Sequence, residues 1–109
     1  MIPSAFAMLL VLAAPGNPAA QSREGYARCL KDLVRSSLEK KLDAAGFETA
    51  LSAACRDKEA AFKAAMVSSE VALGVKRAVA EQGIQSEITD YRSNAKEDFE
   101  AELSSAPKP

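Results

Sequence analysis

The sequence of 109 residues contains no histidine and no tryptophan, and it has only two cysteines, five glycines and five prolines. Histidine is the side chain that most often serves as a general base or a metal ligand, so its absence excludes Ser-His-Asp and Cys-His catalytic arrangements. The sequence also lacks a C-x-x-C pair, a glycine-rich phosphate-binding loop and an EF-hand loop. We therefore predict that the protein is not an enzyme and that it binds no cofactor or metal ion.

Carboxylates are the remaining candidates for catalysis, and a carboxylate- or metal-dependent enzyme is the least favoured of our hypotheses. Asp57 and Glu59 lie close together, and four further acidic residues fall within residues 97–102. A run of charge on a helix is usually a solvated face. Lys63 follows Glu59 by four residues, a spacing that predicts a surface ion pair along one helix.

The charge of the chain is nearly balanced, with 14 Lys and Arg against 15 Asp and Glu and a formal net charge of −1. A nucleic-acid-binding protein carries a basic surplus that neutralises phosphates, so we predict no nucleic-acid partner. Residues 21–63 hold nine basic and seven acidic residues, whereas residues 64–109 hold five and eight. This asymmetry indicates an acidic last helix that lies along a basic first one. It is too small to predict a polyanion or a membrane surface as partner.

Residues 1–20 contain no charged side chain, and residues 5–14 (AFAMLLVLAA) form an unbroken apolar run. A membrane-spanning helix needs about 20 such residues, so the run is too short for an anchor and has the length of a signal-peptide apolar region. Residues 15–18 (PGNP) then break the helix, and Ala19 and Ala20 are small enough for cleavage. We predict a signal peptide over residues 1–20, export to the periplasm or the medium, and no stable membrane insertion after cleavage. The alternative is an apolar segment that is buried or disordered.

The rest of the chain has the composition of helices, because alanine, leucine, glutamate and lysine dominate and glycine and proline are scarce. Apolar residues recur at steps of three and four, which places them on one face of a helix. We predict one all-α domain over residues 21–103 and a disordered tail over residues 104–109. The domain is a small bundle of three to four helices, near residues 24–35, 37–45, 48–82 and 85–103, stapled by one disulfide.

Two glycines are predicted to end helices. Gly46 is followed by the apolar Phe47, which predicts a Schellman motif in which Phe47 contacts Leu42. Gly83 is also followed by an apolar residue, and the same pattern predicts a second helix end there.

The two cysteines, Cys29 and Cys55, are predicted to form a disulfide, because an exported chain with an even number of cysteines usually pairs them. In the chain-entropy account, closing this loop stabilises the fold by roughly 3 to 4 kcal/mol. Two alternatives are open at this point. The cysteines are free buried thiols if the chain is not exported, or they pair between two chains.

A straight first helix that ended at Gly46 would conflict with this disulfide. Cys29 would lie about 24 Å before the turn and Cys55 only about 10 Å beyond it, whereas a disulfide needs Cα atoms within about 7 Å. Ser36 and Glu39 have the S-x-x-E spacing of a capping box, which marks the start of a helix. We therefore predict a bend at residues 35–37 that folds Cys29 back toward Cys55.

Residues 66–79 do not fit one amphipathic face, because Met66 and Leu73 point one way and a set of valines falls almost opposite. Either the helix breaks near residues 68–69, or it is a central helix covered on both sides by its neighbours. In the functional interpretation, the valines meet a protein partner or a second copy of the chain. This candidate partner-binding surface, the valine stripe, consists of Val67, Val71, Val75 and Val79.

Two hypotheses of different classes follow. The leading one is a small exported helical protein that acts through protein–protein binding in the envelope or outside the cell, by its valine stripe. The second is a self-contained structural or stress-related domain with no exposed binding stripe.

Overall fold

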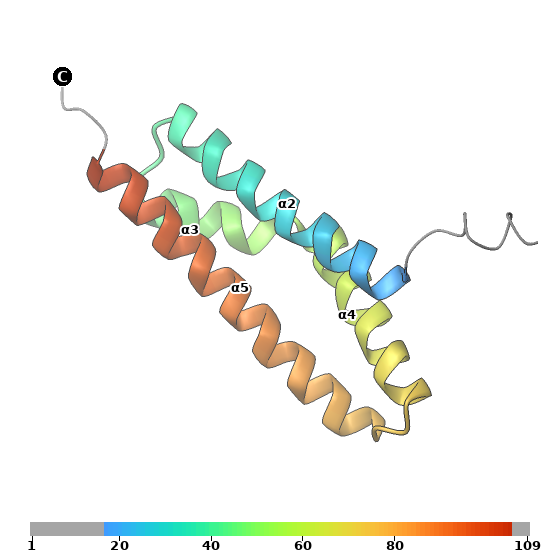
Figure 1. Cartoon of the computed structure of the whole chain (residues 1–109). Helices are drawn as coiled ribbons and strands as arrows, with labels where there is room; N and C mark the ends of the chain where they lie inside the picture. Colours follow the sequence, from blue (N-terminus) through green and yellow to red (C-terminus); the bar gives the residue numbers. More distant parts are fainter. Residues whose placement is uncertain (1–16, 106–109) are drawn as a thin grey trace, which may run out of the picture.

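The computed structural model describes residues 17–105, which form four helices joined by short turns (Figure 1). This part of the chain contains no strand, so the predicted all-α bundle is confirmed. The helices are α2 (Pro18–Glu39), α3 (Ala44–Ala53), α4 (Arg56–Ala72) and α5 (Arg77–Ser105).

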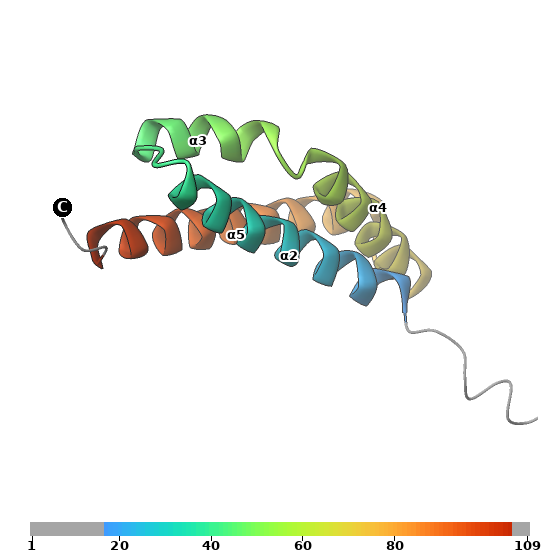
Figure 2. The same ribbon diagram turned by 90° about the horizontal axis from the view of Figure 1, so that it is seen from above.

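Helices α2 and α5 run in the same direction, and α3 and α4 return in the opposite direction (Figures 1 and 2). α2 packs against α3, α4 and α5, and α5 packs against both α3 and α4. The predicted central helix at residues 48–82 is therefore present only in part. Its α4 part packs against α2 and α5, which also pack against each other, and one face of α4 is exposed. The chain turns near Cys55 and again near Gly74, so the predicted bounds were wrong.

α2 begins at the segment that we expected to break a helix. The side chain of Asn17 accepts a hydrogen bond from the backbone N–H of Ala19 at 2.7 Å, and Pro18 occupies the first turn, where its missing N–H leaves no hydrogen bond unmade. The predicted cleavage after residue 20 falls inside this turn, and α5 runs two residues past the predicted domain end at residue 103. Residues 1–16 and 106–109, which hold most of the predicted signal peptide and tail, lie outside the described residues.

The turn between α2 and α3 comes before Gly46. Lys41 has a left-handed backbone with φ 58°, and its N–H donates to the carbonyl of Leu38 at 3.1 Å. The N–H of Leu42 donates to the carbonyl of Ser37 at 3.0 Å. This pair of hydrogen bonds is a Schellman motif in which a lysine takes the position that glycine usually holds.

Gly46 lies in the first turn of α3, so the helix end predicted there was wrong. Asp43 caps this helix, and its Oδ1 accepts a hydrogen bond from the N–H of Gly46 at 2.8 Å. A Cβ atom on Gly46 would lie 3.1 Å from that oxygen. The glycine therefore leaves room for the N-cap of the following helix rather than ending the preceding one.

The second predicted helix end, at Gly83, was also wrong, because Gly83 lies inside α5. The glycine that ends a helix is Gly74, with φ 99°. The N–H of Gly74 donates to the carbonyl of Val71 and that of Val75 to the carbonyl of Glu70, both at 3.0 Å. These bonds form a second Schellman motif and end α4.

Cys29 and Cys55 form the predicted disulfide, with their Cα atoms 5.9 Å apart. The bend predicted at residues 35–37 was wrong, because α2 is one continuous helix and the hydroxyl of Ser36 donates to the carbonyl of Leu33 within it. The disulfide closes because the turn comes early. Cys29 lies about 15 Å before the end of α2, and Cys55 lies about 16 Å beyond the start of α3. Because these two antiparallel segments are nearly equal in length, the two cysteines lie next to each other.

The core is built from large side chains on all four helices. Phe47 of α3 and Phe99 of α5 are fully buried and stack with their ring centroids 4.3 Å apart. Stacked rings at this distance add attraction beyond the area that they bury. The other buried residues of this cluster are Tyr26, Leu30, Leu51, Phe62, Val67, Ala80, Ile84, Ile88 and Ala95.

We predict that Lys41→Gly stabilises the protein by about 0.5–1 kcal/mol, because a left-handed backbone costs a lysine energy that glycine avoids. Lys40 is the matched control, since it precedes Lys41 and has an ordinary helical backbone. Lys40→Gly should therefore lower the free energy of unfolding, by about 0.5–1 kcal/mol. Urea unfolding followed by circular dichroism measures both effects, and changes of the same sign in the two variants would contradict the assignment of the turn.

Candidate functional site

A polar cluster lies where α2, α4 and α5 meet. Oε1 of Glu59 accepts two hydrogen bonds, one from the hydroxyl of Tyr26 and one from Nε of Arg92, both at 2.9 Å. Nη2 of Arg92 forms an ion pair with the same oxygen at 2.8 Å. Glu59 and Arg92 keep only a quarter to a third of their side-chain exposure. Each helix supplies one partner, so the carboxylate joins three helices at one atom.

This arrangement corrects the prediction that Glu59 pairs with Lys63 along one helix. Lys63 instead donates to the side chain of Gln85 on α5 at 3.4 Å. Glu59 points toward the bundle, where Nε and Nη2 of Arg92 both contact its Oε1 in a charge-assisted pair.

An aromatic cluster packs beside Glu59. The rings of Tyr26, Phe62 and Tyr91 have their centroids 5.5–5.7 Å apart, and each ring comes from a different helix. Arg23 lies over the ring of Phe62, 5.6 Å from its centroid, and pairs with Glu87 at 2.9 Å. The arginine therefore combines a cation–π contact with an ion pair from α2 to α5.

The surroundings of Tyr26, Arg92 and Arg23 shift the pKa of each of these three side chains away from neutral pH. Burial and the hydrogen bond to Glu59 raise the pKa of Tyr26 to about 12. Burial is the largest single influence on the pKa of Arg92 and acts to lower it, but the hydrogen bond to Glu59, the charge of Glu59 and the contacts with Tyr26 together outweigh burial and raise that pKa above its usual value. The hydrogen bond to Glu87 likewise raises the pKa of Arg23. Near neutral pH the tyrosine is thus neutral and both arginines are charged, an arrangement that suits a structural cross-link.

The valine stripe does not form one exposed surface. Val67 is buried, and Val71 and Val75 pack half-buried against the core. Of the four, only Val79 is exposed, at 57%. The stripe was predicted from a continuous helix, but the turn at Gly74 interrupts it: Val67 and Val71 lie on α4, Val75 lies in the turn, and Val79 lies on α5.

The most exposed large apolar side chain of residues 17–105 lies next to that turn. Leu73 is 82% exposed, at the end of α4, and Val79 follows in the first turn of α5. Lys76 and Arg77, both exposed, lie between them in the sequence. We call Leu73, Lys76, Arg77 and Val79 the apolar tip.

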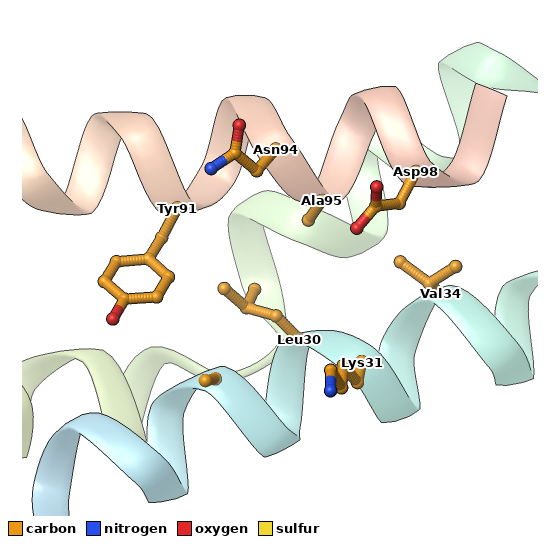
Figure 3. Close-up of a pocket in the computed structure, with 8 residues that line it drawn as sticks. Leu30, Lys31, Val34, Tyr91, Asn94, Ala95 and Asp98 are labelled. Atoms are coloured by element: carbon orange, nitrogen blue, oxygen red, sulfur yellow. The ribbon is translucent and has the colours of Figure 1, made fainter. Parts of the chain in front are cut away.

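A groove of about 200 Å³ lies between α2 and α5, on a face that α3 and α4 do not line (Figure 3). Leu30 and Val34 of α2 point toward Ala95 of α5, while Lys31 and Asp98 stand on opposite walls. The groove continues toward the ends of both helices, where its lining comprises Lys31, Val34, Arg35, Leu38, Asp98, Ala101 and Glu102.

This groove was not predicted from the sequence, although two signals were available. Lys31 and Arg35 are four residues apart, as are Asp98 and Glu102, so each pair forms a charged edge on one helix. Each edge borders apolar or small residues. Recognising that the two edges face one another needed the parallel packing of α2 and α5, which the sequence does not reveal.

Residues 17–105 contain no group of three or more Cys, Asp and Glu side chains placed to hold a metal ion. None of the four helices combines the length and the apolar character that crossing a membrane requires. Comparison of the chain with protein-family models, with curated proteins and with solved structures gives no match.

We predict that Tyr26→Phe weakens the pH dependence of stability above pH 10. Because folding raises the pKa of Tyr26 from 10.0 to about 12, its contribution is fully present below pH 10 and is lost as the pH rises toward 12. The wild type should lose up to about 3 kcal/mol more than the variant over this interval. Near neutral pH the variant should be less stable by about 1–2 kcal/mol, because the hydroxyl no longer bonds Glu59.

Urea unfolding of both proteins at several pH values from 8 to about 11.5 tests this expectation, with non-reducing electrophoresis to verify that the disulfide survives. Tyr91 is present in both proteins, so the difference between them isolates Tyr26. Parallel curves for the two proteins would contradict the role of Tyr26 in the cluster.

Proposed function

We propose that the protein is exported, is not an enzyme, and acts by binding another protein in the envelope or outside the cell. The observation that carries the binding proposal is the 82% exposure of Leu73 on a rigid turn. Large apolar side chains that stand out from a surface commonly mark interaction sites when they gather, and Val79 lies near Leu73 in the sequence.

Two features support export. The disulfide between Cys29 and Cys55 is of a kind that persists in oxidising compartments. Residues 1–20 carry no charge and contain an apolar run of signal-peptide length.

The intact mass of the protein, recovered from the envelope and the medium of producing cells and measured without reduction, tests export. We expect a chain that starts near Gln21 and is two hydrogens lighter than its dithiol form. A full-length chain with Cys29 and Cys55 both reduced would contradict export.

The apolar tip fits a partner of definite chemistry. The Schellman motif at Gly74 fixes the backbone beside Leu73, so little conformational entropy is lost when a partner covers the side chain. Lys76 and Arg77 are exposed on the same turn. The complementary surface is an apolar pocket that is bordered by carboxylates on another protein.

Photocrosslinking in producing cells tests this contact. A photoreactive phenylalanine analogue at position 73 should give a discrete adduct with another protein. The same analogue at Ser93, which is exposed at the middle of α5, is the matched control and should give none. An Arg77→Glu substitution should weaken the adduct at position 73. Identical adduct patterns at positions 73 and 93 would contradict the proposal.

One observation favours the alternative of a self-contained structural domain. Val67, Val71 and Val75 pack against the core, so most of the valine stripe serves the interior of the protein. That alternative predicts no adduct at position 73. The crosslinking experiment therefore separates the two functions.

A further inference from the structure

We propose that the groove between α2 and α5 binds a second copy of this chain, forming a homodimer whose two-fold axis runs along the groove. This contact is distinct from the apolar tip and does not depend on the function proposed above. It rests on the apolar floor of the groove, the signs of charge on its two walls, and the parallel course of its two helices.

The floor of the groove is apolar and lies open. Leu30 is buried, whereas Val34 and Leu38 are half-buried. The half-buried ring of Tyr91, with Ala95 and Ala101, completes the apolar part of the lining on α5. The lining residues all belong to α2 and α5. A second pair of helices that covered this strip would remove its apolar area from water, which lowers the free energy.

The walls of the groove carry opposite charges that are not paired with one another. Lys31 and Arg35 form the basic wall on α2, and Asp98 and Glu102 form the acidic wall on α5. Among the residues described, Lys31, Asp98 and Glu102 make no ion pair. Arg35 pairs only with Asp32 on its own helix, at 3.3 Å and with both side chains largely exposed, which is a weak contact.

These charges select one arrangement of two copies. An axis along the groove places the basic wall of each copy against the acidic wall of the other, twice in the same dimer. Because α2 and α5 are parallel, such an axis also keeps residues at one height together. Lys31, which lines the groove at the level of Asp98, then faces Asp98 of the second copy. An axis across the groove would instead bring Lys31 against Lys31, which like charges oppose.

The contact is small. The groove follows about 17 Å of α2, which places the interface at the lower end of the range for specific protein pairs. We therefore expect a dimer that dissociates on dilution, and one that weakens as salt screens the charged walls.

Analytical ultracentrifugation of the protein recovered from its native compartment, over a range of concentrations, tests this proposal with two charge-reversed variants. Lys31→Glu with Arg35→Glu makes both walls acidic, and Asp98→Lys with Glu102→Lys makes both walls basic. Each variant alone should be monomeric, with a dissociation constant at least tenfold above that of the wild type. An equimolar mixture of the two should form a heterodimer, because each acidic wall then meets a basic one.

Matched controls reverse charges outside the groove. Arg28→Glu with Lys58→Glu, and Asp90→Lys with Glu97→Lys, change the net charge by the same amounts at exposed positions that do not line the groove. Both control variants should dimerise like the wild type. Circular dichroism and a non-reduced mass verify that every variant is folded and carries its disulfide.

Three results would overturn the proposal. The wild type could remain monomeric at every concentration, or the two groove variants could fail to pair when mixed. A dimer that forms only in chains that retain residues 1–16 would place the contact in that segment instead. A monomeric wild type that still crosslinks at position 73 would refute the dimer and leave the proposed function intact.

Discussion

The disulfide between Cys29 and Cys55 is the constraint on which the rest of the structure depends. Cys55 has a left-handed backbone, φ 63°, at the turn that separates α3 from α4. A non-glycine residue in this conformation costs roughly 1–2 kcal/mol, and no side chain caps the helix that follows. In the chain-entropy account the disulfide stabilises the fold by roughly 3 to 4 kcal/mol, which is more than this cost. It thereby fixes the break that lets α3 pack near one end of α5 and α4 near the other.

The same turn explains which parts of the fold were predictable. The composition and the spacing of apolar residues were enough to predict an all-α bundle. The even number of cysteines was enough to predict that the two form a disulfide. The turns were misplaced because a glycine marks either a helix end or a tight N-cap, and only the neighbouring cap, Asp43, distinguishes these uses at Gly46. Lys41 bears no sequence signal for a left-handed backbone. The early turn then removed the conflict that had led us to predict a bend in α2.

The candidate site was harder to predict, because its contacts join residues far apart in the sequence. Glu59 has a local partner four residues away, yet it bonds Tyr26 and Arg92, each 33 residues away. Spacing along one helix predicts only the exposed ion pair with the residue four positions away. Between packed helices, a partly buried carboxylate is stabilised most by the partners that donate the most hydrogen bonds to it. The prediction of the valine stripe as one surface was wrong for a related reason. A periodic pattern of valines does not show where the helix that carries them is interrupted.

The two proposed surfaces have a geometric relation that gives the dimer a consequence for binding. The apolar tip lies at the α4–α5 turn, at the end of the bundle where α5 begins (Figure 1). The two-fold axis of the proposed dimer is parallel to α5, so both copies would point the same way and both tips would lie at the same end of the dimer. A single tip exposes little more than Leu73 and Val79, an area too small for tight binding by itself. If both proposals hold, two tips at a fixed spacing would bind a repetitive or dimeric partner together, and the second contact would form at the high effective concentration that the first one provides.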